Sequence, residues 1–179
     1  MFVKVLFFLE FKKFHFMVKN IAIRAIQKSD NVAVAKLIRE VMTEYDAVGE
    51  GFSIEDTEVD GMYEAYADDL YAFFVIIGDN EVLGCGGIAP LSGGNGKTCE
   101  LRKMYFYPQL RGLGMGRKLL EKCLKTAKEM NYTVCYLETC LSMHKAIALY
   151  EKNGFEMQKS QIGATGHTGC DAYFLKDLV

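Results

Sequence analysis

The sequence contains no tryptophan, only two prolines, and neither a low-complexity tract nor an internal repeat. No apolar run reaches the roughly 20 residues that a membrane-spanning helix needs, so a membrane is not an expected partner. None of the six cysteines belongs to a CxxC pair, which favours reduced thiols in a cytoplasmic protein. The 21 Lys and Arg residues are balanced by 23 Asp and Glu residues and form no long basic run, so nucleic acid is not an expected partner either.

The remaining composition is that of an ordinary globular domain. Half of the 179 residues are hydrophobic and a quarter are charged, which is enough for one domain with a real core. Residues 1–16 form a short apolar stretch that charged residues interrupt, without the small-residue cleavage site of a signal peptide. We expect 1–16 to be an N-terminal extension, in which alternating residues could form an extra strand, and 17–179 to form the domain.

Periodicity and turn residues divide the chain into short elements in the order β-α-α-β-β-β-α-β-α-β-β. The clearest helix is expected from Gly114 to about Met130, and another one ends at Asn153-Gly154. Ser29 or Asp30 can cap the first helix. This order predicts one α/β (α+β) domain with a mixed sheet and helices on both of its faces.

The stretch SGGNGKT, residues 92–98, ends like a nucleoside-triphosphate loop but does not fit one. That pattern requires a glycine at position 91, which is leucine here, and a helix after the loop. The residues that follow, CELRKMYF, alternate like a strand. The sequence therefore predicts a hairpin loop at this position.

The stretch RGLGMG, residues 111–116, lies between an expected strand and an expected helix. The free N–H groups and the dipole at a helix N-terminus attract anions, and glycines let the backbone approach a phosphate closely. The dinucleotide pattern GxGxxG is excluded, because its third glycine would fall on Arg117. The spacing alone favours an anion site and a tightly packed turn equally.

RGLGMG resembles the RxxGxG signature of the GNAT superfamily, the acyl-CoA-dependent N-acyltransferases. Two longer stretches are also similar to that family: CELRKMYFYPQLRGLGMGRKLL, and YLETCLSMHKAIALYEKNGF with its characteristic LYEKNGF ending. The resemblance runs from about Ile21 to Leu178. It implies a single-domain GNAT fold with a mixed, mostly antiparallel sheet flanked by helices, and acetyl-CoA as co-substrate without a metal.

The resemblance also implies which residues bind the co-substrate. The backbone of three strand residues should contact the pantetheine arm and the acyl carbonyl, and the glycine loop should hold the pyrophosphate. The strand residues are Met104, Tyr105 and Phe106. The loop residues are Arg111, Gly112, Leu113, Gly114, Met115, Gly116 and Arg117. One residue departs from the family pattern, since Met143 stands where an asparagine is common.

Glu100 is the candidate catalytic base and Tyr150 the candidate acid. Strand alternation places Glu100, Arg102 and Met104 on one face of the strand, and the residues between them on the other. Glu100 either takes the proton of the amine or is a structural carboxylate paired with an arginine, Arg102 or Arg24. Tyr150 either donates to the leaving thiolate, as the resemblance implies, or is a core aromatic residue. Arg102 either binds a carboxylate of the acceptor or orients Glu100.

The stretch GHTGCD contains His167, Cys170 and Asp171. It is read first as a tight glycine loop with a polar tip, and second as a Cys-His nucleophile. A zinc site is disfavoured, because only His167 and Cys170 have ligand spacing.

These observations predict an N-acetyltransferase that moves an acetyl group from acetyl-CoA to a primary amine by direct transfer. The acceptor is a small molecule or a peptide that the sequence does not identify. The alternative is a catalytically weak acyl-CoA-binding module that acts as a sensor or partner domain. A homodimer is left open.

Overall fold

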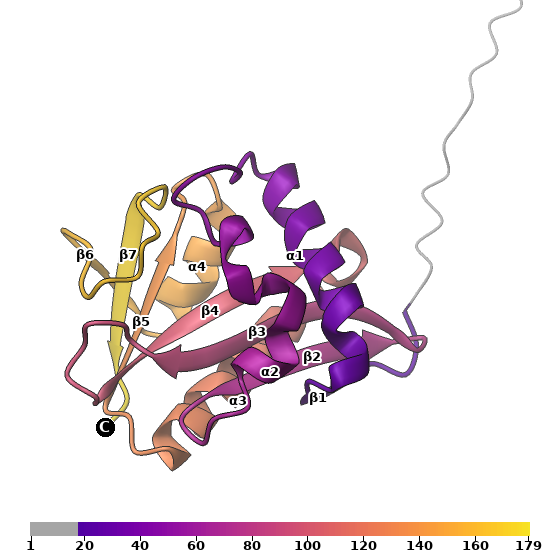
Figure 1. Ribbon diagram of the computed structural model, residues 1–179, viewed down its shortest axis with the longest axis horizontal. Helices are drawn as coiled ribbons and strands as arrows, with labels where there is room; N and C mark the ends of the chain where they lie inside the picture. The colour runs from indigo at the N-terminus through magenta and orange to yellow at the C-terminus, as the bar shows by residue number, and fades with distance from the viewer. Residues whose placement is uncertain (1–17) are drawn as a thin grey trace, which may run out of the picture.

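The computed structural model describes residues 18–179, and the expected extension 1–16 with its extra strand lies outside the described residues. Within the described part, no helix is long and apolar enough to cross a membrane. The four α-helices and seven strands follow one another as expected (Figure 1). Their bounds are β1 Ala22–Ala25, α1 Asn31–Glu44, α2 Met62–Ala65, β2 Ala72–Gly78, β3 Glu81–Pro90, β4 Thr98–Phe106, α3 Met115–Glu129, β5 Val134–Thr139, α4 His144–Lys152, β6 Glu156–Gln158 and β7 Ala172–Asp177.

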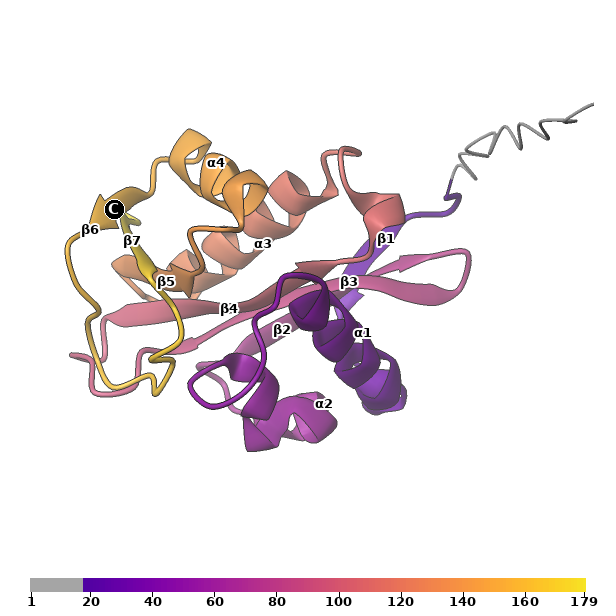
Figure 2. The same ribbon diagram turned by 90° about the horizontal axis from the view of Figure 1, so that it is seen from above.

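The strands form one sheet in the order β1-β2-β3-β4-β5-β7-β6. Only the β4–β5 pair is parallel, and all other neighbours are antiparallel. Helices α1 and α2 cover one face, while α3 and α4 cover the other (Figure 2). The predicted mixed, mostly antiparallel sheet with helices on both faces is therefore confirmed.

Helix α3 has the amphipathic pattern from which the sequence predicted it. Its buried residues recur at helical spacing and face the sheet, while lysines and glutamates occupy the solvent side. The buried set is Met115, Leu119, Leu120, Cys123 and Ala127. The SGGNGKT stretch connects β3 to β4 as a hairpin loop, as predicted.

The first helix begins where the sequence predicted, but not by the predicted contact. Asp30 is the N-cap residue of α1 and makes no side-chain hydrogen bond to the helix. Its carboxylate accepts from the Gln27 N–H and pairs with Arg24 at 2.6 Å instead. Because Arg24 pairs with Asp30, it is not the arginine that pairs with Glu100.

Strands β4 and β5 pair only over a short length. Their register runs from Thr98 opposite Val134 to Glu100 opposite Tyr136 and then stops. Beyond Glu100 the two strands diverge, as Figure 1 shows. The divergence opens the sheet between the end of β4 and the end of β5.

A β-bulge in β4 corrects the alternation expected from the sequence. In the pairing of β3 with β4, Cys85 lies opposite Tyr105 and Gly87 lies opposite Arg102, so β4 has two residues where β3 has one. Lys103, one of the two, has a φ of 51°. The extra residue turns Lys103 onto the same side as Arg102 and moves Met104 to the α3–α4 side. The prediction that Met104 shares a face with Glu100 was therefore wrong.

Gly87, opposite Arg102 in that register, leaves no room for a side chain. A Cβ there would lie 2.4 Å from the Ala72 carbonyl oxygen and 2.5 Å from the Phe73 ring. We expect Gly87→Ala to destabilise the protein by about 3 kcal/mol, because the neighbouring backbone must move. Gly96→Ala is the control, since a Cβ there meets no atom within 4 Å and only its positive φ costs about 1 kcal/mol. Urea unfolding measures both, and equal losses would contradict the packing argument.

Candidate active site

Two cavities meet where β4 and β5 diverge. An outer groove of about 390 Å³ runs over the end of β4, the glycine loop and α4. An inner cavity of about 60 Å³ lies beneath the loops on the α1–α2 side of β4. Both are lined by the same five residues at their junction, which are Met104, Tyr105, Met143, Ala146 and Tyr150.

The glycine loop forms one end of the outer groove. Gly112 and Gly114 have φ values of 81° and 74°, and a Cβ at either position would meet no atom within 4 Å. The first turn of α3 follows directly, so its free N–H groups lie at this end of the groove. Leu113 is exposed, the Met115 side chain is buried in the core, and neither residue is among those that line the groove.

The two arginines of the loop are engaged differently. The Arg111 guanidinium binds both carboxylate oxygens of Glu44 and donates from Nε to the Phe106 carbonyl at 3.0 Å. These bonds tie the end of α1 to the end of β4. Arg117 is exposed and pairs with Glu121 one helical turn further on, at 3.2 Å. Both line the groove, and their contribution to an anion site stays a prediction.

Glu100 is deeply buried on β4, with only 2% of its side chain exposed. Arg102 donates from Nε to Glu100 Oε2 at 2.8 Å, so the ion pair that the sequence left open is present. On the other side, His167 Nδ1 lies 3.8 Å from Glu100 Oε1. Burial raises the pKa of Glu100, while the charges of Arg102 and His167 act against that rise.

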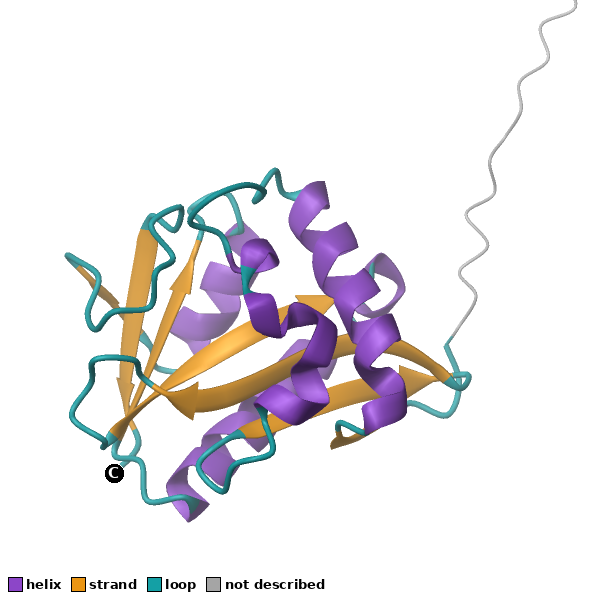
Figure 3. Ribbon diagram, in the orientation of Figure 1, coloured by secondary structure: helices purple, strands orange, loops and turns teal. Residues whose placement is uncertain are grey.

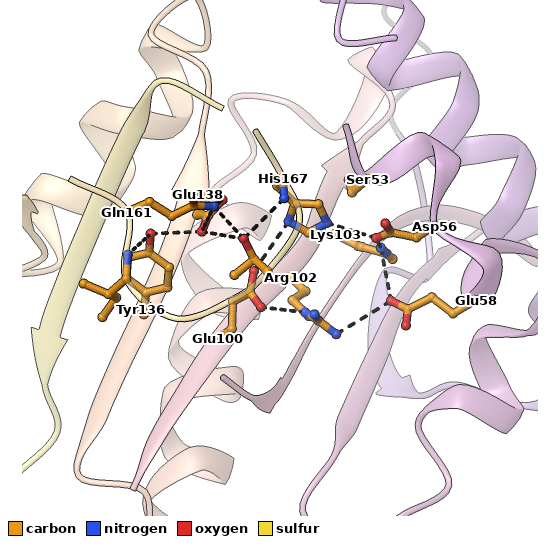
Figure 4. Close-up of polar contacts among 12 residues, drawn as sticks. Ser53, Asp56, Glu58, Glu100, Arg102, Lys103, Tyr136, Glu138, Gln161 and His167 are labelled. Carbon is orange, nitrogen blue, oxygen red and sulfur yellow. Dashed lines mark hydrogen bonds and ion pairs between the residues drawn. The ribbon is translucent and has the colours of Figure 1, made fainter. Parts of the chain in front are cut away.

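Lys103 is held by two carboxylates from the segment after α1. Its Nζ lies 2.5 Å from Asp56 and 3.1 Å from Glu58, and the lysine side chain is almost fully buried. Burial works against ionisation of Asp56, but the hydrogen bond from His167 and the charge of Lys103 prevail and lower its pKa to about 2. Figure 4 shows these side chains converging beside β4.

His167 belongs to the same cluster, which the sequence did not predict. Its Nε2 lies 3.1 Å from Asp56 Oδ2, a residue 111 positions away in the chain. The hydrogen bond with Asp56 raises the pKa of His167, although burial opposes the rise. Among the described residues, the imidazole contacts carboxylates, and no hydrogen bond joins it to the Cys170 thiol.

Cys170 lies beside Cys140 rather than beside a base. The hydrogen bond with Cys140 and burial raise the pKa of the Cys170 thiol, whereas a nucleophilic cysteine needs a lowered one. The Asp171 carboxylate accepts from the Leu141 N–H at 2.7 Å. The loop is therefore glycine-rich and tightly anchored, but its histidine points inward and is not a polar tip.

Glu138 is a further carboxylate of the inner cavity that the sequence analysis missed. Three neutral groups donate to it: the Tyr136 hydroxyl at 3.0 Å, the Thr165 hydroxyl at 2.9 Å, and Gln161 Nε2 at 3.0 Å (Figure 4). The strand alternation of β5 places Tyr136 and Glu138 on one side, which is the only signal that could have found it.

Tyr150 lies at the junction of the two cavities. Its ring packs near Phe155 and Phe174, at centroid distances of 5.9 and 6.3 Å, and burial raises the pKa of its phenol. The residue is thus a core aromatic with a neutral phenol, and it lines both cavities. Met143, at the position where the family often has asparagine, lines the same junction and contributes no amide.

Known proteins resemble this chain in sequence over most of its length. Residues 34–155 match the model of the Acetyltransferase (GNAT) family. The chain belongs to the GNAT acetyltransferase family. It is 41% identical over 156 residues to YjgM of Escherichia coli K12, an uncharacterized N-acetyltransferase, covering 87% of this chain and 93% of that protein. It is also 38% identical over 84 residues to an IAA acetyltransferase of Azospirillum brasilense, covering 46% of this chain and 53% of that protein.

Solved GNAT structures share the fold at lower identity. An acetyltransferase of Streptococcus agalactiae superposes with a TM-score of 0.77 at 18% identity, over 89% of this chain and 99% of that one. YncA of Salmonella typhimurium, solved with its cofactor acetyl-CoA, gives 0.73 at 21% identity over 89% and 94% of the two chains. This GNAT protein is therefore an acyltransferase by family and by fold.

The Asp56 network predicts a pH-dependent loss of stability. The native pKa of about 2 lies below the ordinary 3.8, so Asp56 stabilises the fold above pH 4 and this contribution is lost as the pH falls through about 2. Asp56→Asn should cost about 2 kcal/mol at pH 7, with the difference from wild type shrinking below pH 4. Urea unfolding at several pH values measures it.

Asp60→Asn is the matched control for this experiment. Asp60 pairs with Arg39 on the surface, so its loss should change stability much less at pH 7. If the cost of Asp56→Asn were the same at every pH, the ionised carboxylate would not be its source.

Proposed function

We propose that the protein transfers an acetyl group from acetyl-CoA to a primary amine of a small-molecule or peptide acceptor by direct transfer. One observation carries the proposal: the outer groove and the inner cavity meet at Tyr150. A thioester in the groove and an amine in the cavity would approach each other there. The buried Glu100 lies on the amine side of that meeting point.

The outer groove supports acetyl-CoA as co-substrate. The open space at Gly112 and Gly114 suits a pyrophosphate, and the N-terminus of α3 would supply N–H donors. Because β4 leaves β5 after Glu100, the backbone of Met104, Tyr105 and Phe106 is available to bond the pantetheine arm. The acetyl-CoA in the Salmonella structure and the coenzyme A in a PaiA N-acetyltransferase of Thermoplasma acidophilum agree with this assignment.

The inner cavity supports the chemistry of the amine. Glu100, with its raised pKa, takes a proton from the ammonium, directly or through water. The amine nitrogen then bonds to the thioester carbon while the carbon–sulfur bond breaks, and the nitrogen releases its second proton to solvent water as the amide forms. Tyr150 donates a hydrogen bond or a proton to the leaving thiolate. Arg102 uses Nε to orient Glu100, and its Nη1 lies 3.9 Å from Glu58 Oε1. The rest of its guanidinium is assigned to a polar group of the acceptor.

Met143 favours a second candidate function. Without the asparagine amide, the junction offers one polar contact fewer to the co-substrate arm. A module that bound acyl-CoA as a sensor without turnover would tolerate that loss. The two functions differ in their need for the Tyr150 hydroxyl.

Gly114→Glu tests the co-substrate site. The added carboxylate would occupy the groove and repel a pyrophosphate, so calorimetric titration with acetyl-CoA should show at least a hundredfold loss of affinity. Gly96→Glu is the control, because Gly96 has the same φ of 74° and equally open surroundings in the loop before β4. Acetyl-CoA bound equally well by both variants would remove the loop from the site.

Tyr150→Phe tests the enzyme against the sensor. Loss of the hydroxyl should lower kcat by 10²-fold or more, while the affinity for acetyl-CoA stays within twofold because the ring packing is retained. Release of free thiol in the presence of a panel of primary amines measures the rate. An unchanged rate would exclude Tyr150 as the acid, and a native protein that binds acetyl-CoA without transfer to any amine would establish the sensor.

A further inference from the structure

We infer that His167, held by Asp56, is a positioning residue that orients Glu100 and keeps it ionised, and that it does so only while the loops 45–61 and 159–171 are docked together. This inference rests on the proposed role of Glu100 as the base. It concerns a residue of the GHTGCD stretch to which the proposed chemistry gives no task.

The carboxylate of Glu100 is held from two opposite sides. Arg102 binds Oε2 at 2.8 Å, and it comes from the same strand. His167 faces Oε1 at 3.8 Å, and it comes from the loop between β6 and β7. Arg102 therefore accompanies Glu100 in any loop conformation, whereas His167 reaches it only when the loop is in place.

Asp56 fixes the orientation of the imidazole. Its carboxylate binds Nε2 at 3.1 Å, so Nδ1 is directed toward Glu100 (Figure 4). A carboxylate behind a histidine selects which ring nitrogen carries the proton and favours the imidazolium. Lys103 binds the same Asp56 oxygen, Oδ2, at 2.5 Å. The order Lys103, Asp56, His167, Glu100 is therefore a continuous chain of charged contacts that ends on the base.

The two loops pack closely against each other at two glycines, Gly51 and Gly169. The Gly169 N–H donates to the Gly51 carbonyl at 2.9 Å. A Cβ at Gly169 would lie 2.7 Å from the Phe52 ring, and a Cβ at Gly51 would lie 2.4 Å from the Thr168 hydroxyl. In Figure 3 the teal loop that follows α1 and the teal loop before β7 gather at the end of the sheet where β4 and β5 diverge. The docking places Asp56 and His167 in contact.

Several charged or titratable groups from different elements face Glu100. Arg102 and His167 favour its ionised form, and Glu138 on β5 opposes it. Tyr66, directly after α2, and Tyr136 on β5 are also near, as neutral phenols with raised pKa. Asp56, Glu58 and Lys103 lie one contact further out, where the single Lys103 ammonium is shared by two carboxylates. Of the two groups that favour the ionised form of Glu100, Arg102 lies on the same strand and His167 lies on a loop, and the charge of His167 changes between zero and +1 with pH.

The first test is the pH profile of kcat/KM for His167→Gln. Glutamine keeps a polar side chain but cannot carry charge, so Glu100 should become harder to ionise. We expect the acidic limb to move upward by about one pH unit, with acetyl-CoA affinity unchanged within twofold. His144→Gln, on an exposed histidine of α4, is the matched control and should leave the profile in place. A pH-independent fall in rate with an unmoved limb would reduce His167 to a structural role and overturn the inference.

The second test does not need turnover. The imidazoles of His144 and His167 can be titrated by NMR in the full chain, before and after Glu100→Gln. We expect the His167 pKa to fall when the neighbouring charge is removed, and the His144 pKa to stay where it was. An unmoved His167 would overturn the inference. If His167 moves but no amine is acetylated, the pairing stands and the proposed function fails instead.

The third test asks whether Asp56 acts through His167. Asp56→Asn and His167→Gln should each lower kcat, and the double variant should be no worse than the poorer single one. Additive losses would mean that Asp56 supports the site by another route and would overturn that part of the inference.

Discussion

The early end of the parallel pairing between β4 and β5 is the constraint on which the site depends. A parallel pair buried in a sheet normally satisfies both backbones along its length. Here the pairing stops at Glu100 and Tyr136, so within residues 18–179 no strand pairs with the following part of β4 on that side. The bulge at Lys103 adds to the divergence, since bulges bend and twist the strand that carries them. The groove and the inner cavity are both consequences of this one opening.

The bulge also explains why so many charges gather at one point. Regular alternation would send Arg102 and Lys103 to opposite faces. With Lys103 at a φ of 51°, both cations lie on the α1–α2 side and need carboxylates there. Glu100, Asp56 and Glu58 supply them. A buried lysine without such partners would cost several kcal/mol, so the acidic segment after α1 must lie over β4.

The sequence was sufficient for those features that depend on local pattern. The apolar spacing of α3, the hairpin loop at residues 92–98 and the glycine loop before a helix are all local signals, and the structure has these elements as predicted. The residues assigned to the pyrophosphate rest on family resemblance, and that assignment stays a prediction. The bulge was missed because a lysine with positive φ leaves no mark in the spacing of apolar residues. The contact of His167 with Asp56, and those of Glu138 with Gln161 and Thr165, were missed because these partners are distant in sequence. No periodicity links residues 111 positions apart.

The cost of the inner cluster bears on the choice between an enzyme and a sensor. Glu100 and Lys103 have almost no exposed surface, and replacing such buried ion pairs with apolar residues is often neutral or stabilising. A module that only bound acyl-CoA would use the groove, the glycine loop and the β4 backbone, none of which requires charges on the acceptor side. Perturbed carboxylates cluster where a proton has to be moved. The fold therefore bears a destabilising arrangement at the one place where an amine would lose its proton, and this is the physical reason to prefer the transferase.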